Sequence, residues 1–185
     1  HPEALQAAVE AHGADVGLAL DGDADRVLAV DAAGELIDGD QIIGICAIDR
    51  HRRGVLANDT VVVTVMSNLG FRQGMAAQGI TVVDTAVGDR YVLEALQAGG
   101  HALGGEQSGH VIFADRASTG DGLLTGLALL DVMARSGRSL ADLAAEAMTR
   151  LPQVLINVRM ATKVPDIVER IAGPIAAAED RLGDR

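Results

Sequence analysis

The chain has 185 residues, of which 49% are hydrophobic and only 2% are aromatic, and its formal net charge is −11. This length and composition allow the packed core of one domain or of parts of two, and they exclude an intrinsically disordered chain. The acidic balance, with Lys163 as the single lysine, argues against nucleic acid as a partner, because nucleic-acid binding depends on clustered basic side chains. It leaves room for one small anionic ligand held by local arginines.

Three further observations bear on the compartment and the extent of the chain. The lone cysteine, Cys46, cannot form an internal disulfide, which favours a reducing, cytoplasmic compartment. No apolar run reaches the length of a membrane span and no signal peptide is visible, so we expect no membrane partner. The chain begins at His1 within a helical pattern and without an initiator methionine, so we expect a portion of a longer protein.

Helices and strands are predicted to alternate along the chain. The first elements are a helix, two strands and a third strand after a hairpin turn, at 2–12, 16–20, 27–30 and 35–37. The middle elements alternate between helix and strand, at 41–51, 60–66, 68–78, 80–84, 89–97 and 101–103. The last elements are two helices, a strand and a final helix, at 121–135, 139–150, 154–160 and 165–182.

This alternation predicts an α/β fold with mixed, mostly parallel sheets and helices on both faces. The hairpin turn at Ala33-Gly34 adds an antiparallel edge to the predicted sheet. We expect one complete domain at residues 37–151, flanked by partial domains at 1–36 and 152–185. The first partial domain then contains the most unusual stretch of the sequence, an aspartate-rich loop.

The stretch "LALDGDADRVLAVD" places Asp21, Asp23 and Asp25 at alternate positions inside an apolar run. Neighbouring carboxylates repel one another and lose hydration unless a cation lies among them. In a flat strand the first and the third would be about 13 Å apart, too far for a Mg²⁺ ion that binds oxygens at about 2.1 Å. We therefore predict that the loop curls, at the small residues Gly22 and Ala24, into an oxygen-ligand site that favours Mg²⁺.

Three alternatives compete with a magnesium site in this loop. An EF-hand needs glycine at its sixth position and glutamate at its twelfth, where this chain has Arg26 and Ala32, so it is rejected. A phosphatase of the haloacid-dehalogenase type stays open, although it needs a downstream lysine and only Lys163 is present. A solvated acidic turn also stays open, although such turns seldom lie between two buried strands.

A glycine-rich loop carries a second group of candidate residues. The stretch "GGEQSGH" displays Glu106, Gln107, Ser108 and His110, a set suited to hydrogen-bonding hydroxyl groups. A phosphate-binding P-loop is rejected, because histidine and valine follow where lysine and a hydroxyl residue are required. A plain polar turn stays open as the structural alternative.

A third group of candidates lies between the end of a predicted strand and the start of a helix. There the stretch "TAVGDRYV" places Gly88, Asp89 and Arg90, at the edge where ligands collect in open α/β sheets. A capping Asp89 with Arg90 in solvent is the structural alternative. The stretch "STGDG" is explained at least as well by a helix capped by Thr119 or Asp121 as by a dinucleotide fingerprint.

Taken in order, "DGDADR", "TVMSNLG", "VGDRY" and "GGEQSGH" resemble the α-D-phosphohexomutase superfamily. The resemblance covers essentially the whole chain. The glutamine of "GEQSGH" and the residues of "VGDRY" are most similar to members that act on glucosamine phosphate. The resemblance implies a cytoplasmic four-domain enzyme that interconverts sugar 6- and 1-phosphates through a bisphosphorylated intermediate. Members that act on mannose or glucose phosphates are the nearest alternative.

The resemblance also implies roles for the candidate residues. Asp21, Asp23 and Asp25 would hold Mg²⁺ against the phosphate of a phosphoserine. Arg26 would stand beside that phosphate as a catalytic residue, and His110 would lie close to the reacting end of the sugar as the candidate general base. Two loops would bind the phosphosugar substrate, through Gly88, Asp89, Arg90, Glu106, Ser108 and His110.

Two parts of the superfamily pattern are missing from these 185 residues. One is the first-domain Ser-His-Asn-Pro loop with the catalytic serine, and the other is the fourth-domain Arg-Pro-Ser-Gly-Thr phosphate clamp. We therefore expect the end of domain 2, all of domain 3 and the start of domain 4, without mutase activity on their own. The expected partners are the phosphosugar and domains 1 and 4 of the parent chain, and a homodimer of the parent stays open. A non-catalytic metal- or sugar-phosphate-binding module is the alternative of a different class.

Overall fold

The computed structural model describes residues 2–160, 162 and 164–182. The contacts divide the chain into two compact units, with the boundary between Leu151 and Pro152. The larger unit contains two sheets and all of the candidate site residues, whereas the smaller contains two short helices. None of the described helices combines the length and the apolarity that crossing a bilayer requires.

The first sheet is an antiparallel meander. Its elements, with the helix that packs against it, are α1 (Glu3–His12), β1 (Val16–Leu20), β2 (Val27–Asp31) and β3 (Leu36–Ile37). These bounds confirm the predicted helix and strands to within one residue. The strands form a sheet of their own and not an edge of the parallel sheet, because β2 pairs with β1 on one side and with β3 on the other.

The second sheet is mixed and has the strand order β5-β4-β6-β7. In chain order its strands are β4 (Thr60–Thr64), β5 (Thr81–Thr85), β6 (Leu103–Gly105) and β7 (Val111–Phe113). β4 pairs in parallel with both β5 and β6, and β7 pairs antiparallel with β6. The α/β class is therefore confirmed. β7 is absent from the sequence prediction, because three apolar residues after a loop are too few to show a period.

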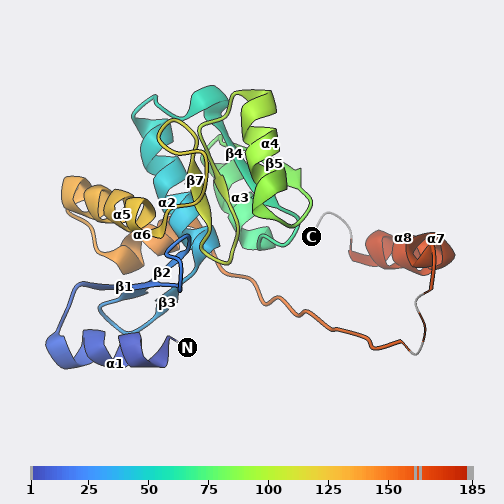
Figure 1. Ribbon diagram of the computed structural model, residues 1–185, viewed down its shortest axis with the longest axis horizontal. Helices are drawn as coiled ribbons and strands as arrows, with labels where there is room; N and C mark the ends of the chain where they lie inside the picture. Colours follow the sequence, from blue (N-terminus) through green and yellow to red (C-terminus); the bar gives the residue numbers. More distant parts are fainter. Residues whose placement is uncertain (1, 161, 163, 183–185) are drawn as a thin grey trace. The chain divides into compact units, whose positions relative to one another are not determined.

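Helices cover both faces of the second sheet, which lies between α2 (Gly39–Arg52) and α4 (Asp89–Gly99) (Figure 1). β4 is buried on both sides: Val62 packs in the cluster on the α4 face, whereas Val61 and Val63 pack in the larger cluster with α2. The topology explains this arrangement. The chain crosses from β4 to β5 in one direction and returns across β4 to β6, so two right-handed crossovers place their helices on opposite faces.

α2 begins at a capping box that involves Asp38. The Asp38 Oδ1 accepts the Gln41 N–H at 3.2 Å, and the Gln41 Oε1 accepts the Asp38 N–H at 3.3 Å. This reciprocal pair satisfies two donors at the helix start. The rest of α2 is largely buried, because it packs against the sheet and against the neighbouring helices α3 (Leu69–Ala77), α5 (Gly122–Ser136) and α6 (Leu140–Ala147).

The predicted helix at 139–150 ends three residues early, at Ala147. Beyond it the backbone of Leu151 is held by one side chain: the Asn68 Oδ1 accepts its N–H at 3.1 Å, and the Asn68 Nδ2 donates to its carbonyl at 2.8 Å. The same Asn68 caps α3 by accepting the Gly70 N–H at 2.9 Å. A helix continued to residue 150 would instead direct the Leu151 N–H to the carbonyl of Ala147.

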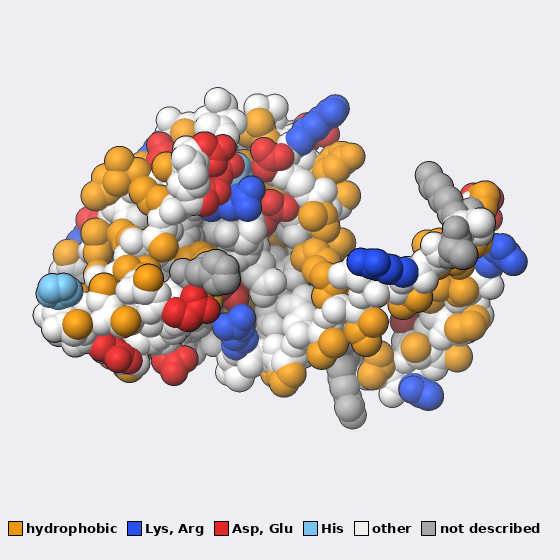
Figure 2. All heavy atoms as spheres, turned by 60° about the horizontal axis from the view of Figure 1, so that its bottom comes forward, with side chains coloured by type: hydrophobic (Ala, Val, Ile, Leu, Met, Phe, Trp, Pro, Cys, Tyr) orange, Lys and Arg blue, Asp and Glu red, His pale blue; other side chains and the backbone are white. Residues whose placement is uncertain are grey.

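The sequence prediction is wrong in the smaller unit. The alternating residues 154–160 form no strand, and Val154, Ile156 and Val158 are about four-fifths exposed, at 80%, 77% and 79%. A strand needs a neighbour for its backbone groups, and none pairs with this part of the described chain. Hydrophobic side chains are accordingly visible on the surface here (Figure 2).

The helix predicted at 165–182 is divided into α7 (Ile167–Arg170) and α8 (Ala172–Leu182). Pro174 explains the interruption. It has no N–H to donate to the carbonyl of Arg170, and its ring would clash with that carbonyl in a continuous helix. Proline is tolerated in a first turn, which is its position in α8.

Candidate functional site

Two of the predicted loops meet at the carboxyl edge of the second sheet. β4, β5 and β6 are parallel, so their carboxyl ends lie at one edge, and the chain reverses its direction of travel there. Ligands in open α/β sheets bind at such a reversal. The Glu106 Oε1, after β6, accepts the Gly88 N–H, after β5, at 3.0 Å. The structure therefore brings the "VGDRY" and "GGEQSGH" loops together.

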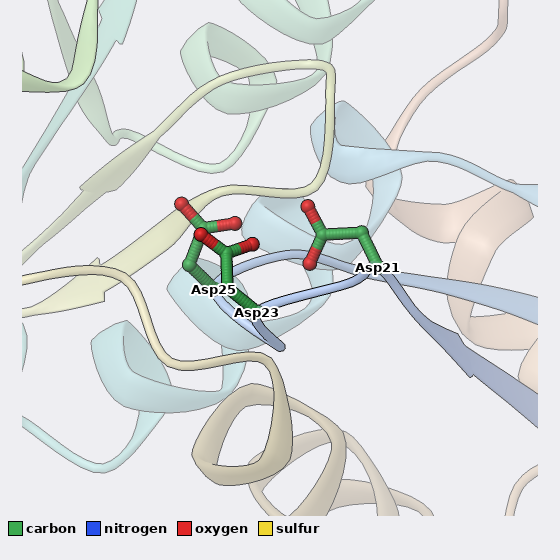
Figure 3. A group of neighbouring side chains, drawn as sticks. All are labelled: Asp21, Asp23 and Asp25. Atoms are coloured by element: carbon green, nitrogen blue, oxygen red, sulfur yellow. The ribbon is translucent and has the colours of Figure 1, made fainter.

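The aspartate loop connects β1 to β2 and curls as predicted (Figure 3). The Ala24 N–H donates to the Asp21 carbonyl at 3.2 Å, and Ala24 adopts a left-handed φ of 60°. The Arg26 N–H then donates to the Asp21 Oδ1 at 3.2 Å. These turns place the three carboxylates on the same side of the loop, where they face one another (Figure 3).

The geometry of the three carboxylates fits a small hard cation. One oxygen from each of Asp21, Asp23 and Asp25 lies within 4.8 Å of the other two. Oxygens at neighbouring positions about 2.1 Å from an octahedral Mg²⁺ lie about 3.0 Å apart, so side-chain rotations that bring the three oxygens closer together would close the site. The buried Asp25 Oδ1 accepts no hydrogen bond from the described residues, and its one ion-pair neighbour among them is the Arg26 guanidinium, whose Nε lies 3.5 Å away.

Arg26 balances part of the negative charge in this loop. Its Nε lies 3.4 Å from the Asp21 Oδ2 and 3.5 Å from the Asp25 Oδ1. Its side chain is 52% exposed, so water screens both ion pairs and they contribute little stability. An exposed guanidinium beside three carboxylates is free to turn toward an incoming anion.

His110 joins the aspartate loop to the "GGEQSGH" loop. Its side chain is 4% exposed, and its Nδ1 lies 3.1 Å from the Asp25 Oδ2. The backbones also meet, because Arg26 and His110 form an isolated antiparallel bridge and the Val27 N–H donates to the Gly109 carbonyl at 3.1 Å. The aspartate loop and the "GGEQSGH" loop therefore contact each other through both side chains and backbone.

Among the remaining predicted site residues that the structure describes, Ser108 lies close to the aspartate loop, whereas Asp89 and Arg90 make no hydrogen bond or ion pair with it. Ser108 lines a pocket of about 320 Å³ together with Asp21 and Arg26, so it belongs to the same site. Asp89 and Arg90 begin α4, where the Arg90 Nε donates to the Glu94 Oε1 at 2.7 Å. Within the part of the chain that the structure describes, no hydrogen bond or ion pair connects Asp89 or Arg90 to the aspartate loop.

Two glycines of the site are absent from the sequence prediction. The Gly39 N–H donates to the Gln107 carbonyl at 3.0 Å, and a Cβ on Gly39 would lie 2.2 Å from the Glu106 carbonyl oxygen. The Gly120 N–H donates to the His110 Nε2 at 3.1 Å. The high glycine content of the chain is the only sequence signal for such close approaches, and it does not indicate which glycines make them.

Asp40 is a buried carboxyl in the first turn of α2. It is fully buried, and burial raises its pKa from 3.8 to about 6, although the Asn68 N–H, 2.7 Å from its Oδ2, opposes the rise. A folded-state pKa above the unfolded value means that the folded protein holds this proton more tightly. The contribution of Asp40 to stability is therefore greatest below pH 3.8 and is lost as the pH rises through about 6.

Replacing Asp40 by asparagine is expected to remove this pH dependence. Asparagine keeps an oxygen for the Asn68 N–H and carries no charge. The free energy of unfolding of Asp40→Asn, relative to the wild type, should rise by up to about 3 kcal/mol between pH 4 and pH 7.5. Urea unfolding across this range measures it, with Asp180→Asn in the exposed part of α8 as the control. Parallel pH profiles for wild type and Asp40→Asn would contradict the prediction.

The fold and the loops define an α/β domain with a cluster of three carboxylates beside a glycine-rich polar loop, near the carboxyl edge of the parallel strands. Residues 38–151 match the family described as "Phosphoglucomutase/phosphomannomutase, alpha/beta/alpha domain III". This match covers more than half of the chain. The chain therefore belongs to the phosphoglucomutase/phosphomannomutase family.

Individual relatives confirm the predicted resemblance to phosphohexomutases. The phosphoglucosamine mutase of Frankia alni is 62% identical over 185 residues, covering 100% of this chain and 40% of the relative. The phosphoglucosamine mutase of Acidothermus cellulolyticus is 62% identical over 183 residues, covering 98% of this chain and 40% of the relative. The solved phosphoglucomutase/phosphomannomutase family protein of Burkholderia thailandensis is 32% identical with a TM-score of 0.70, covering 84% and 33% of the two chains. This chain thus spans about 40% of the length of the curated relatives it matches.

Proposed function

We propose that this chain is the central part of a phosphoglucosamine mutase, an isomerase that interconverts glucosamine 6-phosphate and glucosamine 1-phosphate. The support is the 62% identity to relatives of that name over the whole chain. In this proposal residues 1–36 complete domain 2, residues 37–151 form domain 3 and residues 152–185 begin domain 4. The rest of a longer parent chain would supply domain 1, with its catalytic serine, and the phosphate clamp of domain 4.

The observation that carries the proposal is the convergence of three carboxylates, within 4.8 Å of one another, beside a loop suited to sugar hydroxyls. Phosphoryl transfer depends on positioning and charge stabilisation more than on covalent help from side chains. Asp21, Asp23 and Asp25 would hold Mg²⁺, which when bound neutralises negative charge on the phosphoryl group. Arg26 would add a second positive charge beside the same phosphate.

The two loops at the sheet edge would bind the sugar. The Gly88 N–H donates a hydrogen bond to the Glu106 Oε1. The second carboxylate oxygen of Glu106 would therefore be the one that accepts from a sugar hydroxyl. Ser108 would offer a hydroxyl from the adjoining pocket. Contacts to ring hydroxyls, and not to either phosphate, suit a mutase, because the same sugar must bind in two orientations. Arg90 remains available to an anion, since its exposed pair with Glu94 is weak.

The substrate class is tested by assaying the full-length parent protein on glucosamine, glucose and mannose phosphates. We expect the highest kcat/KM on glucosamine phosphate. The family description also names phosphoglucomutase and phosphomannomutase, so either activity is the second candidate. A preference for mannose or glucose phosphate would replace our proposal by that candidate.

We expect the 185-residue chain alone to turn over no phosphosugar, because it contains no serine loop for the phosphoryl group. A coupled assay of the purified chain, with the parent protein as the positive control, measures this. Turnover by the isolated chain would contradict the proposal that the catalytic serine lies in another part of the parent.

The alternative, a non-catalytic binding module, predicts instead that the parent also lacks the serine loop. The coding sequence upstream of His1 tests this alternative. We place the parent in the cytoplasm, in keeping with the free, buried Cys46.

A further inference from the structure

Another pocket lies between α2 and α5, toward the opposite edge of the second sheet from the candidate site. Its volume is about 200 Å³, and its lining comes from the second half of α2, from α5 and from the end of β7 with the turn that follows. β7 runs antiparallel to β6, so Val111 lies at the carboxyl edge of the parallel strands and Phe113 lies toward their amino edge. None of the candidate site residues, all of which the structure describes, lines this pocket.

Arginines dominate the charged part of this lining. Four arginines and two aspartates line the pocket, although the whole chain has a net charge of −11. The arginines are Arg50, Arg53, Arg116 and Arg135. Two of them are already compensated, because Asp49 accepts from Arg135 at 2.8 and 3.0 Å and pairs with Arg53 at 3.2 Å. The other two, Arg50 and Arg116, are less fully satisfied.

Arg50 is buried and lacks an acceptor for one of its donors. Its side chain is 10% exposed, and its Nη2 donates to the Asp115 Oδ2 at 2.8 Å. Its guanidinium lies over the ring of Phe113, 5.8 Å from the ring centroid. Its Nε is buried and has no hydrogen-bond partner among the described residues. A buried donor without a partner costs free energy, so an anion in the adjoining pocket would relieve that cost after a small rotation of the guanidinium.

Arg116 adds a positive charge that no ion pair with a described residue compensates. It follows β7 and is exposed, and its N–H donates to the Phe113 carbonyl at 2.8 Å. This turn holds Arg116 next to the residue whose ring Arg50 covers. A guanidinium can bind two oxygens of a phosphate or a carboxylate at once. Two such groups in one pocket therefore favour an anion with several oxygens.

The rest of the lining is largely apolar. Cys46, Phe113 and Val132 are buried there, whereas Leu127 on α5 is 56% exposed. An exposed leucine beside a pocket gains free energy when a ligand removes its surface from water. Ordinary ligand sites have volumes of about 300–1,000 Å³, so a pocket of about 200 Å³ fits only a small molecule.

We propose that this pocket binds a small organic anion, with the anionic group between Arg50 and Arg116 and an apolar body against Leu127. A phosphate monoester fits best, because it carries nearly two negative charges at neutral pH and faces two arginines. This inference goes beyond the proposed function and does not depend on it, since the pocket shares no residue with the candidate site.

Phenyl phosphate is the probe for this site, because it joins a phosphate to an apolar ring. Calorimetric titration of the full-length protein measures its affinity, with inorganic phosphate as the comparison that lacks the apolar body. We expect phenyl phosphate to bind about tenfold more tightly than inorganic phosphate or better, because the ring is removed from water against Leu127.

Two substitutions separate the two parts of the recognition. Arg116→Ala should weaken the binding of phenyl phosphate about 10–100-fold, the usual loss for a hydrogen bond to a charged group. Leu127→Ala should weaken it about threefold to tenfold and leave the binding of inorganic phosphate unchanged. Arg52→Ala is the matched control, because it removes the same charge near the end of α2 from a residue that does not line the pocket.

Several outcomes would overturn the proposal. Unchanged affinity in Arg116→Ala is one, and an equal loss in Arg52→Ala is another, because the general field of the protein would then explain the binding. Binding that is lost in Arg26→Ala and kept in Arg116→Ala would place the phosphate at the candidate site instead. Absence of binding of phenyl phosphate to the wild type at millimolar concentrations would show that the pocket takes only water.

A further measurement on the wild type does not depend on the folding of any variant. In methyl NMR spectra of the full-length protein, phenyl phosphate should shift the signals of Leu124, Leu127 and Val132, which line the pocket. The methyl signals of Leu20, which lines the pocket beside the aspartate loop, should stay in place. Shifts confined to Leu20 would contradict the proposal directly.

Discussion

Asp23→Asn is expected to lower the affinity of the full-length protein for Mg²⁺ by about 100-fold or more. An amide oxygen carries no net charge, so the variant removes one of three carboxylates that lie within 4.8 Å of one another. The proposed mutase activity should fall in parallel, because the same ion would neutralise charge on the phosphoryl group. Isothermal titration calorimetry measures the affinity, and unchanged affinity would count against the site.

Thermal unfolding adds a second signature to this variant. Without magnesium, Asp23→Asn should be at least as stable as the wild type, because the substitution relieves repulsion among the carboxylates. With Mg²⁺ at 100 times the wild-type dissociation constant, only the wild type should gain about 2.7 kcal/mol of stability by mass action. Asp15→Asn, an exposed aspartate just before β1, should follow the wild type in both conditions.

Gly39→Ala is expected to destabilise the protein by about 2–3 kcal/mol, although alanine is ordinarily the better helix former. The new Cβ would lie 2.2 Å from the Glu106 carbonyl oxygen and 2.6 Å from the Gly109 N. Both are backbone atoms, so the helix or the whole "GGEQSGH" loop must move. Because that loop is the proposed sugar-binding loop, KM for the phosphosugar should rise as well.

Urea unfolding and steady-state kinetics measure the two effects of Gly39→Ala. Gly173→Ala in α8 is the matched control, because no atom lies within 4 Å of a Cβ at that position. There the helix propensity of alanine should act alone and raise helix stability slightly. A Gly39→Ala protein with wild-type stability and KM would show that the loop can shift freely and would remove Gly39 from the site.

Elements with a strong local signal were predictable from the sequence. The apolar run that forms β1, the helix that ends at the left-handed Gly13, and the curl of the aspartate loop all follow from neighbouring residues. The strand expected at 154–160 was wrong because alternation describes only which faces are apolar. A strand also needs a partner, and the described chain pairs none with this segment.

The candidate site was predictable as a set of loops and not as a set of contacts. The expectation that the loop after β5 lies at the ligand-binding edge of the sheet agrees with the structure, which places the loop after β6 at the same edge. Gly39 and Gly120 contact residues that are distant in the sequence, so no local sequence pattern predicts these contacts. For the same reason the sequence indicated His110 only as a candidate base, whereas the structure shows which atom each ring nitrogen faces.

The hydrogen bond between His110 and Asp25 spans 85 positions of the sequence. Bringing these two residues together closes a long loop of the chain. Such contacts form late in folding, because the chain loses conformational entropy before the contact can compensate for it. During synthesis, Asp25 cannot be held until the ribosome has released the polypeptide as far as Gly120 and the second sheet has assembled. The proposed affinity for magnesium should therefore appear only when the tertiary structure is complete.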